Sequence, residues 1–404
     1  MGLDQEFLID WFHRFYKAQP PRSPPHMDRR EFGFMFFDRN FVQRHMGFAT
    51  EGEMQSFLIS QVPAHVYHSA AYYHFPSAPT MNEKRWGGAD LIFDLDADHM
   101  KGADSMSYED MLARIKVELI RLIDDFLLGD FGVDVSDLKI VFSGGRGYHI
   151  HVSDERIIHL KSHERREIVD YVSGTDLNID WVFPERVAAY KTFQGRTKES
   201  RIRSIPSPSS GGWKKRLRTG IEWLIEDMRA RDVTDLKNRF PTISKINNNI
   251  IQGMLNDLYD RSQGTEGAKL MLENNVFAYF SDRRHLNLFM SLIYDEVRPR
   301  FRSEIDEPVT SDIKRLIRLP QSLHGKTGLK VVPMSREILG AFEPLRDAVP
   351  NMYPDDEIEI FVKGRQTGNL RGQRYDLEGL CEAPLYLAIF LIARREATLE
   401  IPSD

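Results

Sequence analysis

The feature that most constrains this chain is an apolar run, Leu91-Ile92-Phe93, that leads directly into Asp94-Leu95-Asp96. Successive side chains of a strand point to opposite faces, so Asp94 and Asp96 lie on one face, roughly 6.5–7 Å apart, and Leu95 points toward a core. Two like charges held so close are unfavourable unless a cation neutralises them, and carboxylate oxygens suit Mg²⁺ or Mn²⁺. The pattern predicts a strand that ends at a metal site for phosphoryl chemistry, with a solvated acidic strand end as the alternative.

Length and composition bound the class of protein. The 404 residues are enough for two or three domains, and 41% hydrophobic with 28% charged residues is ordinary for a soluble globular chain. No apolar run approaches the roughly 18 residues of a membrane span, and the N-terminus lacks a signal-peptide pattern. The single cysteine, Cys381, excludes an internal disulfide and a cysteine-based zinc site. We therefore expect a cytoplasmic protein without membrane association.

The charge is uneven along the chain. A formal net charge of −6 argues against a general nucleic-acid coat protein, but not against an enzyme with one basic groove. Between Lys191 and Arg218 the balance reverses, and prolines with a Ser-Ser-Gly-Gly stretch indicate a loop. This loop is either solvated surface or a contact for nucleic-acid phosphates. The candidate residues for that contact are Arg196, Lys198, Arg201, Arg203, Lys214, Lys215 and Arg216.

The periodicity of the rest predicts an α/β (α+β) core with a mixed sheet, interrupted by a smaller, mostly helical insertion. We place the core at 1–190 and 276–404 and the basic insertion at 191–275. Ser107 with Asp110 resembles a capping box at the start of a long helix. The other expected elements are a helix in 1–20, strands at 30–36, 138–152 (with a glycine turn), 328–333, 356–363 and 370–376, helices over 219–300, and a last helix at 385–393.

A second motif is the glycine turn Ser143-Gly144-Gly145-Arg146-Gly147, followed by His149. Glycines let backbone N–H groups approach an anion closely, and arginine offers a fork of donors suited to phosphate. The motif is neither a Walker A loop nor a Rossmann fingerprint. A tight hairpin without a ligand is the alternative. His151 shares the strand face of His149 and is expected to pack there.

A third motif covers 306–328. Thr310 or Ser311 can cap a helix with Ile313, Leu316 and Ile317 on its apolar face. We expect Lys314 and Arg315 to be solvated. Arg318, His324 and Lys326 follow Asp306, a candidate third carboxylate, and as three separate donors they favour a triphosphate site.

Together these segments resemble the catalytic small subunit of the archaeal and eukaryotic DNA primases, most closely the archaeal form. The resemblance runs through Arg30-Glu31-Phe32, 91–98, 143–152 and 306–329, and so spans nearly the whole chain. It implies a primase-type catalytic core that makes short RNA primers, with DNA as an alternative product, on single-stranded DNA. The implied reaction is nucleotidyl transfer from nucleoside triphosphates with two Mg²⁺ or Mn²⁺ ions.

The resemblance also implies roles for residues. The family's metal-binding aspartates match Asp94, Asp96 and Asp306, and its nucleotide site matches Ser143, Arg146, His149, Arg318 and His324, with Arg30 as an addition. The residues themselves add Gly144 and Lys326 to this expected nucleotide site. The family often has a second arginine where this chain has Gly145. Many members carry a Cys/His zinc knuckle after the acidic strand, but 98–107 has no cysteine, so no structural zinc is expected. Asp98 is not expected to bind the metal directly; we expect it next to the metal-binding aspartates or at the surface. The implied partner is a large subunit with an iron–sulfur domain.

Three other functions stay open from the residues alone. A metal-dependent glycosyltransferase also uses two aspartates after an apolar strand, but it would not require the segment 306–328 or a basic groove. A non-catalytic nucleic-acid scaffold has no reason to keep three repelling carboxylates. A repair-type primase-polymerase would share the chemistry and extend existing ends.

Overall fold

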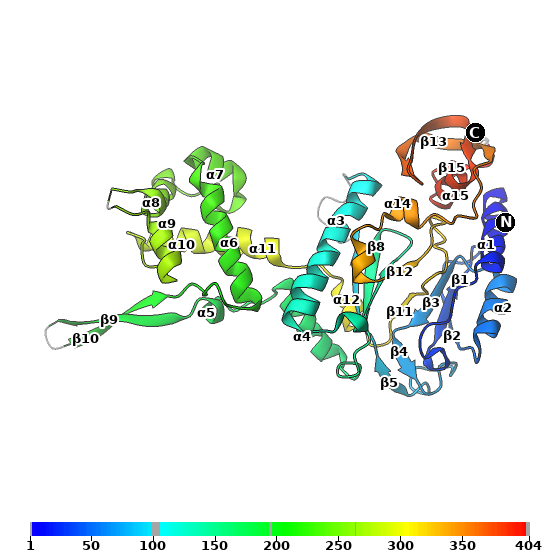
Figure 1. Ribbon diagram of the computed structural model, residues 1–404, viewed down its shortest axis with the longest axis horizontal. Coiled ribbons are helices and arrows are strands. Elements are labelled where there is room, and N and C mark those ends of the chain that lie inside the picture. Colours follow the sequence, from blue (N-terminus) through cyan, green and yellow to red (C-terminus); the bar gives the residue numbers. More distant parts are fainter. Residues whose placement is uncertain (1, 98–105, 194–195, 263, 401–404) are drawn as a thin grey trace. The chain divides into compact units, whose positions relative to one another are not determined.

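The computed structural model describes residues 2–97, 106–193, 196–262 and 264–400. The chain forms two compact units (Figure 1). The first, here called the core unit, comprises 1–128, 132–169 and 304–404, and the second, the inserted unit, comprises 129–131 and 170–303. An insertion within a core was expected, but at 191–275. The inserted unit extends further on both sides, because the hairpin before it and the helices after it pack within it.

Two four-stranded antiparallel sheets organise the core unit. The first, here the site sheet, has the order β12-β7-β8-β6, and the second, the partner sheet, has the order β11-β3-β1-β2. The strands of the site sheet are β6 (Leu91–Asp96), β7 (Leu138–Phe142), β8 (Gly147–Val152) and β12 (Val332–Met334); those of the partner sheet are β1 (Phe32–Met35), β2 (Gln43–Met46), β3 (His65–Ser69) and β11 (Leu316–Arg318). A short ribbon pairs β4 (Ala71–Tyr73) with β5 (Trp86–Ala89). The expected α+β fold is confirmed, and the described strand pairs are antiparallel where a mixed sheet was expected.

Helices cover the two sheets. The helix α3 (Tyr108–Arg121) packs on β6 and β8, and Ser107 caps it as expected, with its Oγ accepting from the Asp110 N–H. A π-helical segment, Leu122–Asp130, continues it. The helix α1 (Leu3–Ala18) packs on α2 (Glu51–Gln61), and their aromatic and aliphatic side chains form a buried core with β1. The chain also forms the helix α4 (Ser162–Ser173) and two short helices, α13 (Arg336–Leu339) and α14 (Pro344–Asp347).

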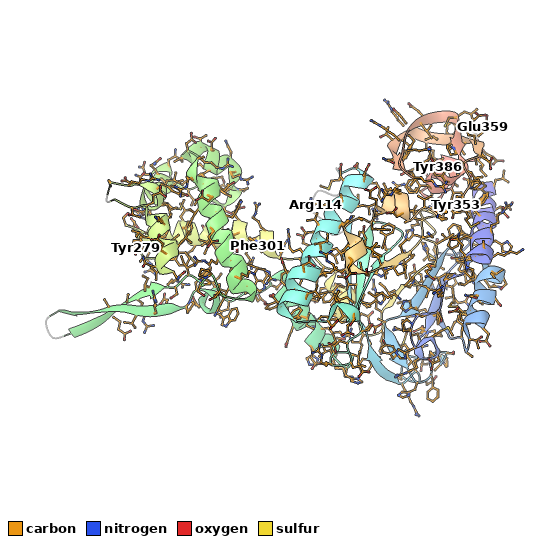
Figure 2. The ribbon with its side chains drawn as sticks, viewed as in Figure 1. Arg114, Tyr279, Phe301, Tyr353, Glu359 and Tyr386 are labelled. Atoms are coloured by element: carbon orange, nitrogen blue, oxygen red, sulfur yellow. The ribbon has the colours of Figure 1, made fainter. Side chains whose placement is uncertain are left out.

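A long hairpin and a buried helix end the chain. The strands β13 (Glu357–Leu370) and β14 (Gln373–Pro384) pair with each other, and β13 also pairs with β15 (Ala397–Thr398). The helix α15 (Leu385–Ala393) is buried along its whole length. Tyr353 lies before the hairpin and is labelled in Figure 2. Its hydroxyl donates to the Gly328 carbonyl at 3.2 Å, and its ring meets the Trp11 ring edge-on. This contact ties α1 to the loop that follows His324.

The segment after Asp306 differs from expectation. A helix was expected after Thr310 or Ser311, but α12 spans Glu307–Ser311 and begins after Asp306, with Pro308 in its first turn. The chain then forms β11, which pairs with β3 through Leu316 and Ser69. The apolar spacing that suggested a helix face is overridden because Ile317 is buried in a sheet.

The inserted unit is mostly helical. It begins with α5 (Ile179–Val182) and a hairpin of β9 (Glu185–Phe193) and β10 (Arg196–Arg203). The helix α6 (Gly212–Arg229) is its centre, and Trp213 at its start is 1% exposed. The remaining helices are α7 (Val233–Arg239), α8 (Asn248–Tyr259), α9 (Gly267–Asn274), α10 (Arg283–Leu292) and α11 (Arg298–Phe301). In the part of the chain that the structure describes, no helix is long and apolar enough to cross a membrane.

Candidate active site

The acidic strand is built as the alternation predicts. Asp94 and Asp96 are half-buried on one face of β6, and Leu95 is 3% exposed on the other. Asp306 is the N-cap residue of α12, and its backbone N–H donates to the Asp94 carbonyl oxygen at 3.0 Å. The structure therefore brings the start of α12, from a distant part of the sequence, beside the end of the acidic strand.

The electrostatics of Asp94 show that these carboxylates act on one another. Burial, followed by the negative charges of Asp96 and Asp306, raises the pKa of Asp94 to about 7. The guanidinium groups of Arg315 and Arg318 act in the opposite direction without cancelling the rise. Arg315, expected to be solvated, is thus close enough to influence the carboxylates.

His149 lies directly across from Asp94 in the pairing of β8 with β6. Paired residues of an antiparallel sheet share a face, so the His149 ring lies on the face of the two aspartates. The ring is 1% exposed, and neither of its nitrogens has a hydrogen-bond partner within the described residues. Burial and the charge of Arg318 hold the pKa of His149 well below its usual range, so the ring is neutral. A buried imidazole without partners is costly, and it favours a ligand that supplies them.

The glycine turn between β7 and β8 closes through the Ser143 N–H, which donates to the Gly147 carbonyl at 3.0 Å. Gly144 has φ +76°, a left-handed conformation that favours glycine, and a Cβ there would lie 2.7 Å from the Cβ of His324. A Cβ at Gly145 would lie 2.9 Å from the His324 Nε2. Gly145, where the resemblance leads one to expect arginine, thus lets the His324 ring pack against the turn.

Two residues that the sequence did not single out hold this turn in place. The Tyr108 hydroxyl donates to the Gly145 carbonyl at 2.6 Å. The Thr327 hydroxyl donates to the Gly144 carbonyl at 2.5 Å and lies 3.2 Å from the His324 Nδ1. Both carbonyl oxygens are therefore occupied by protein groups. Arg146, at the tip of the turn, is exposed to solvent.

A further residue that sequence reasoning missed, His65 of β3, positions Arg318. The Arg318 Nη1 donates to the His65 Nδ1 at 2.7 Å, and the guanidinium lies over the Tyr67 ring, 5.3 Å from its centroid. The His65 and His324 rings meet edge-on at 4.8 Å. Burial, followed by the charges of Arg318 and Lys326, holds the pKa of His65 well below its usual range. His65 is therefore a neutral acceptor that orients a cationic donor.

The charged residues of the second and third motifs converge on the same place. The pKa of His324 is lowered well below its usual range by burial and then by the positive charges of Arg318, Lys326 and Arg146. At neutral pH the histidines are thus uncharged, and the positive charge comes from the arginines and the exposed Lys326. A site with neutral hydrogen-bonding rings among fixed cations suits the oxygen atoms of a phosphate chain.

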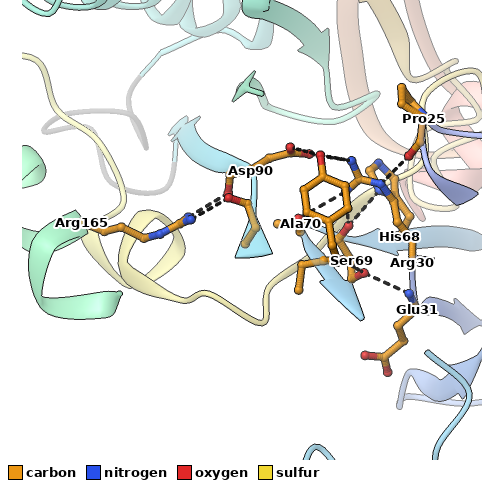
Figure 3. A network of polar contacts seen from close by, with 11 residues as sticks. Pro25, Arg30, Glu31, His68, Ser69, Ala70, Asp90 and Arg165 are labelled. Atoms are coloured by element: carbon orange, nitrogen blue, oxygen red, sulfur yellow. Dashed lines mark hydrogen bonds and ion pairs between the residues drawn. The ribbon is translucent and has the colours of Figure 1, made fainter. Parts of the chain in front are cut away.

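Arg30 belongs to a different cluster (Figure 3). It is 2% exposed, and its guanidinium donates to Asp90 at 2.8 Å, to the Tyr72 hydroxyl at 3.0 Å and to backbone carbonyls that include Ser69 and Pro25. All its nitrogens are used inside the protein, so Arg30 holds β1, β3 and the loop before them together. We therefore leave Arg30 out of the proposed nucleotide site.

The basic residues of the inserted unit divide into buried and exposed ones. Arg216 is buried, and its Nη1 pairs with Asp130 at 2.6 Å, so it has a structural role in place of the nucleic-acid contact expected for it. Arg201 and Arg203 form ion pairs at the surface, whereas Lys215 is exposed and Lys214 lies over the exposed Trp181 ring at 4.6 Å. The side chains of Arg196 and Lys198, and Asp98 in the core unit, lie outside the described part of the chain.

The donor set at the acidic strand fits a divalent metal ion. Among the described residues, no group of three or more His, Cys, Asp or Glu side chains is arranged to hold an ion as it stands. Carboxylate oxygens are nevertheless the ligands that Mg²⁺ and Mn²⁺ prefer. Burial and the nearby charges of Asp96 and Asp306 both disfavour ionised Asp94, and a bound cation would favour it.

Comparison with known proteins identifies the family. The family model for the DNA primase small subunit matches residues 93–336. The chain is 40% identical over 394 residues to the DNA primase small subunit PriS of Methanothrix thermoacetophila, which covers 96% of this chain and 97% of the relative. This chain belongs to the DNA primase small-subunit family. As a primase small subunit of the archaeal type, it is a nucleotidyltransferase.

Other relatives give the same result over the full length. The PriS protein of Methanocella arvoryzae is 39% identical to this chain, and the alignment covers 98% of each protein. The PriS protein of Halorubrum lacusprofundi is 38% identical, and the alignment covers 97% of each protein. The family match includes the end of β6 from Phe93 to Asp96, the glycine turn and the segment from Asp306 to His324. The primase prediction is thereby confirmed, and the glycosyltransferase and scaffold alternatives are not supported.

Proposed function

We propose that this primase subunit joins nucleotides at the face of β6, with Asp94, Asp96 and Asp306 as its metal-binding carboxylates. The observation that carries the proposal is the convergence of these acids with the cationic groups of Arg318, Arg146 and Lys326 within one unit. Carboxylates beside phosphate-binding cations are the two halves of a phosphoryl-transfer site.

The three aspartates would bind the metal ions. Two bound Mg²⁺ or Mn²⁺ ions would lower the pKa of the attacking 3′-hydroxyl and offset charge on the leaving pyrophosphate. Asp94, Asp96 and Asp306 would hold these ions, and their oxygens need not act as a general base. Ionised Asp94 is required for this, so a pKa near 7 makes metal binding compete with a proton at and below neutral pH.

The triphosphate would lie between the glycine turn and β11. The exposed Arg146 and the oriented Arg318 supply charge from two sides, and Lys326 adds a third cation. His149 has free nitrogens on the aspartate face and would donate a neutral hydrogen bond to a phosphate oxygen. Ser143 and Gly144 shape the turn so that it accommodates a ligand. Catalysis would then rest on alignment and fixed charges.

The template and the partner follow from the family. We infer that the chain acts on single-stranded DNA with nucleoside triphosphates, and that a larger subunit with an iron–sulfur domain completes the enzyme, since its relatives are named small subunits. Lys214 and Lys215, with the exposed Trp181 beside them, are the described residues of the inserted unit best suited to a DNA strand. Lysines contact phosphates, and an exposed indole offers a face for base stacking.

The test compares the wild-type chain with Asp94→Asn and Asp96→Asn on unprimed single-stranded DNA, with Mn²⁺ or Mg²⁺ and labelled nucleotides. Asp10→Asn is the matched control, because Asp10 is exposed on α1 and forms a surface ion pair with Arg14 of the same helix. We expect short template-dependent products from the wild type and the control, and a loss on the order of 10²–10³-fold in the two variants. Calorimetric titration of nucleotide with metal gives the same comparison without requiring synthesis. Wild-type synthesis and binding by either variant would exclude the proposed site.

A further inference from the structure

One tyrosine side chain connects the glycine turn of the proposed nucleotide site to the C-terminal part of the chain. Tyr108 is the first residue of α3, and its hydroxyl donates to the Gly145 carbonyl at 2.6 Å. Arg394 directly follows α15, and its guanidinium lies over the Tyr108 ring, 4.6 Å from the centroid. The side chain is therefore held by a hydrogen bond at its hydroxyl and by a cation on the face of its ring.

Arg394 is itself held in place by Glu396. Its Nε and Nη2 donate to the two carboxylate oxygens of Glu396 at 2.8 and 2.7 Å, a bidentate arrangement that fixes the plane of the guanidinium. The Glu396 carbonyl accepts from the Lys363 N–H of β13 at 2.8 Å, and the Glu396 N–H donates to the Leu391 carbonyl of α15 at 2.9 Å. Arg394 is thus anchored to both β13 and α15, and it supports the Tyr108 ring from a fixed position.

The electrostatics of Tyr108 place its hydroxyl close to the reacting groups. Burial raises the pKa of this hydroxyl, so it stays protonated at neutral pH and can donate. The positive charges of Arg394 and Arg146 lower this pKa, and the negative charge of Asp96 raises it. Tyr108 is therefore near both the arginine of the turn and the acidic strand.

The hydrogen bond to Gly145 sets the direction of the next peptide group. A trans peptide is planar, so the Arg146 N–H points in the direction opposite to the Gly145 carbonyl that Tyr108 holds. Thr327 fixes the preceding peptide in the same way, through the Gly144 carbonyl. Glycines leave the peptide groups of a turn free to rotate, and here two side-chain hydroxyls remove that freedom. Tyr108 thus fixes the peptide that carries Arg146.

We propose that Tyr108 is a positioning residue for nucleotide binding, which acts through Arg146 and is supported by Arg394. The inference rests on the proposed function, in which Arg146 supplies charge to the triphosphate. With the hydroxyl in place, the peptide of Arg146 has one orientation before the nucleotide arrives, so binding does not have to order it. Without the hydroxyl, the peptide can rotate and the contacts of Arg146 with phosphate oxygens weaken.

The test is Tyr108→Phe, which removes the hydroxyl and keeps the ring beneath Arg394. Tyr259→Phe is the matched control, because Tyr259 of α8 is also half-buried, donates to the Ile225 carbonyl at 2.6 Å and has Arg229 over its ring. Calorimetric titration of ATP with Mn²⁺ measures affinity, and steady-state synthesis gives KM and kcat. We expect Tyr108→Phe to weaken ATP binding and raise KM roughly fivefold, the loss that follows removal of one hydrogen bond, with kcat within about twofold of the wild type. The control should change neither affinity nor KM.

Double variants test the route of the effect. In an Arg146→Gln background, Tyr108→Phe should cause no further loss of ATP affinity, because it acts through Arg146. Arg394→Met should weaken ATP binding in the wild-type background and add nothing to Tyr108→Phe. Arg394→Met also provides the comparison if Tyr108→Phe melts well below the control.

The outcomes separate this inference from the proposed function. Unchanged ATP affinity in Tyr108→Phe, an equal loss in Tyr259→Phe, or losses from Tyr108→Phe and Arg146→Gln that add together would overturn the positioning role. If the wild type binds ATP and Asp94→Asn loses synthesis while Tyr108→Phe is unaffected, only this inference fails. If the wild type binds no ATP in the presence of metal, the proposed function fails and this inference fails with it.

Discussion

Replacing Asp94 by asparagine should stabilise the metal-free protein at alkaline pH and much less at acidic pH. The folded protein raises the pKa of this carboxyl from 3.8 to about 7, so the folded state binds the proton more tightly than the unfolded state. Ionised Asp94 therefore disfavours folding. This penalty is absent below about pH 4, grows as the pH rises toward 7, and is constant above that. Asparagine has no such charge.

The magnitude follows from the shift. A pKa difference of about 3 units at about 1.4 kcal/mol each gives about 4 kcal/mol at pH 8, and less than about 2 kcal/mol at pH 5. Calorimetric melting in the presence of a chelator checks this, because it separates the transitions of the two units. At roughly 2 °C per kcal/mol, the variant should melt roughly 8 °C above the wild type at pH 8.

A matched control and a metal titration complete the experiment. Asp10→Asn removes an exposed carboxylate on α1 and controls for the change in net charge. Mg²⁺ or Mn²⁺ should stabilise the wild type at pH 8 and stabilise Asp94→Asn less, because the ion occupies the position where the charge is unfavourable. An asparagine variant that melts below the wild type at pH 8, or that shifts melting equally at both pH values, would refute the electrostatic account.

Three further predictions concern the turn and the inserted unit. Gly145→Ala should reduce nucleotide affinity and cost about 1–3 kcal/mol, because its Cβ would press on the His324 ring; nucleotide titration and melting measure both. Arg216→Met should destabilise the inserted unit by about 3 kcal/mol, since it leaves the half-buried Asp130 with the Tyr171 hydroxyl but without its cation, and calorimetry would show a lower second transition. Lys215→Met should leave the melting temperature unchanged and reduce the slope of log binding constant against log salt concentration by about one, which corresponds to one released counterion. A salt titration of DNA binding by fluorescence anisotropy measures this slope, and an unchanged slope would contradict a phosphate contact.

Local patterns predicted the parts of the site that depend on near neighbours. The alternation in β6, the cap of α3 by Ser107 and the hairpin around Gly144 all depend on residues within a few positions of one another. Such features are fixed by strand period, capping chemistry and glycine conformation, so one sequence suffices to predict them.

The predictions that differ from the structure concern side chains whose partners are distant in the sequence. Arg30 is held by Asp90, 60 residues away, and Arg216 by Asp130, 86 residues away. No local sequence pattern distinguishes an arginine that pairs with a buried carboxylate from an arginine that binds a ligand. His65 was missed for the same reason, since its role exists only where β3 meets β11.

The order of strands in the two sheets has a consequence for synthesis on the ribosome. Both β11 and β12 are edge strands of their sheets and follow the inserted unit in the chain. Until they emerge, β3 and β7 keep open hydrogen-bonding edges, which can pair with other chains. At ribosomal speeds of roughly 5–20 residues per second, making the inserted unit takes on the order of ten seconds. The same late segment brings Asp306, so the nascent chain gains its edge protection and its third carboxylate together.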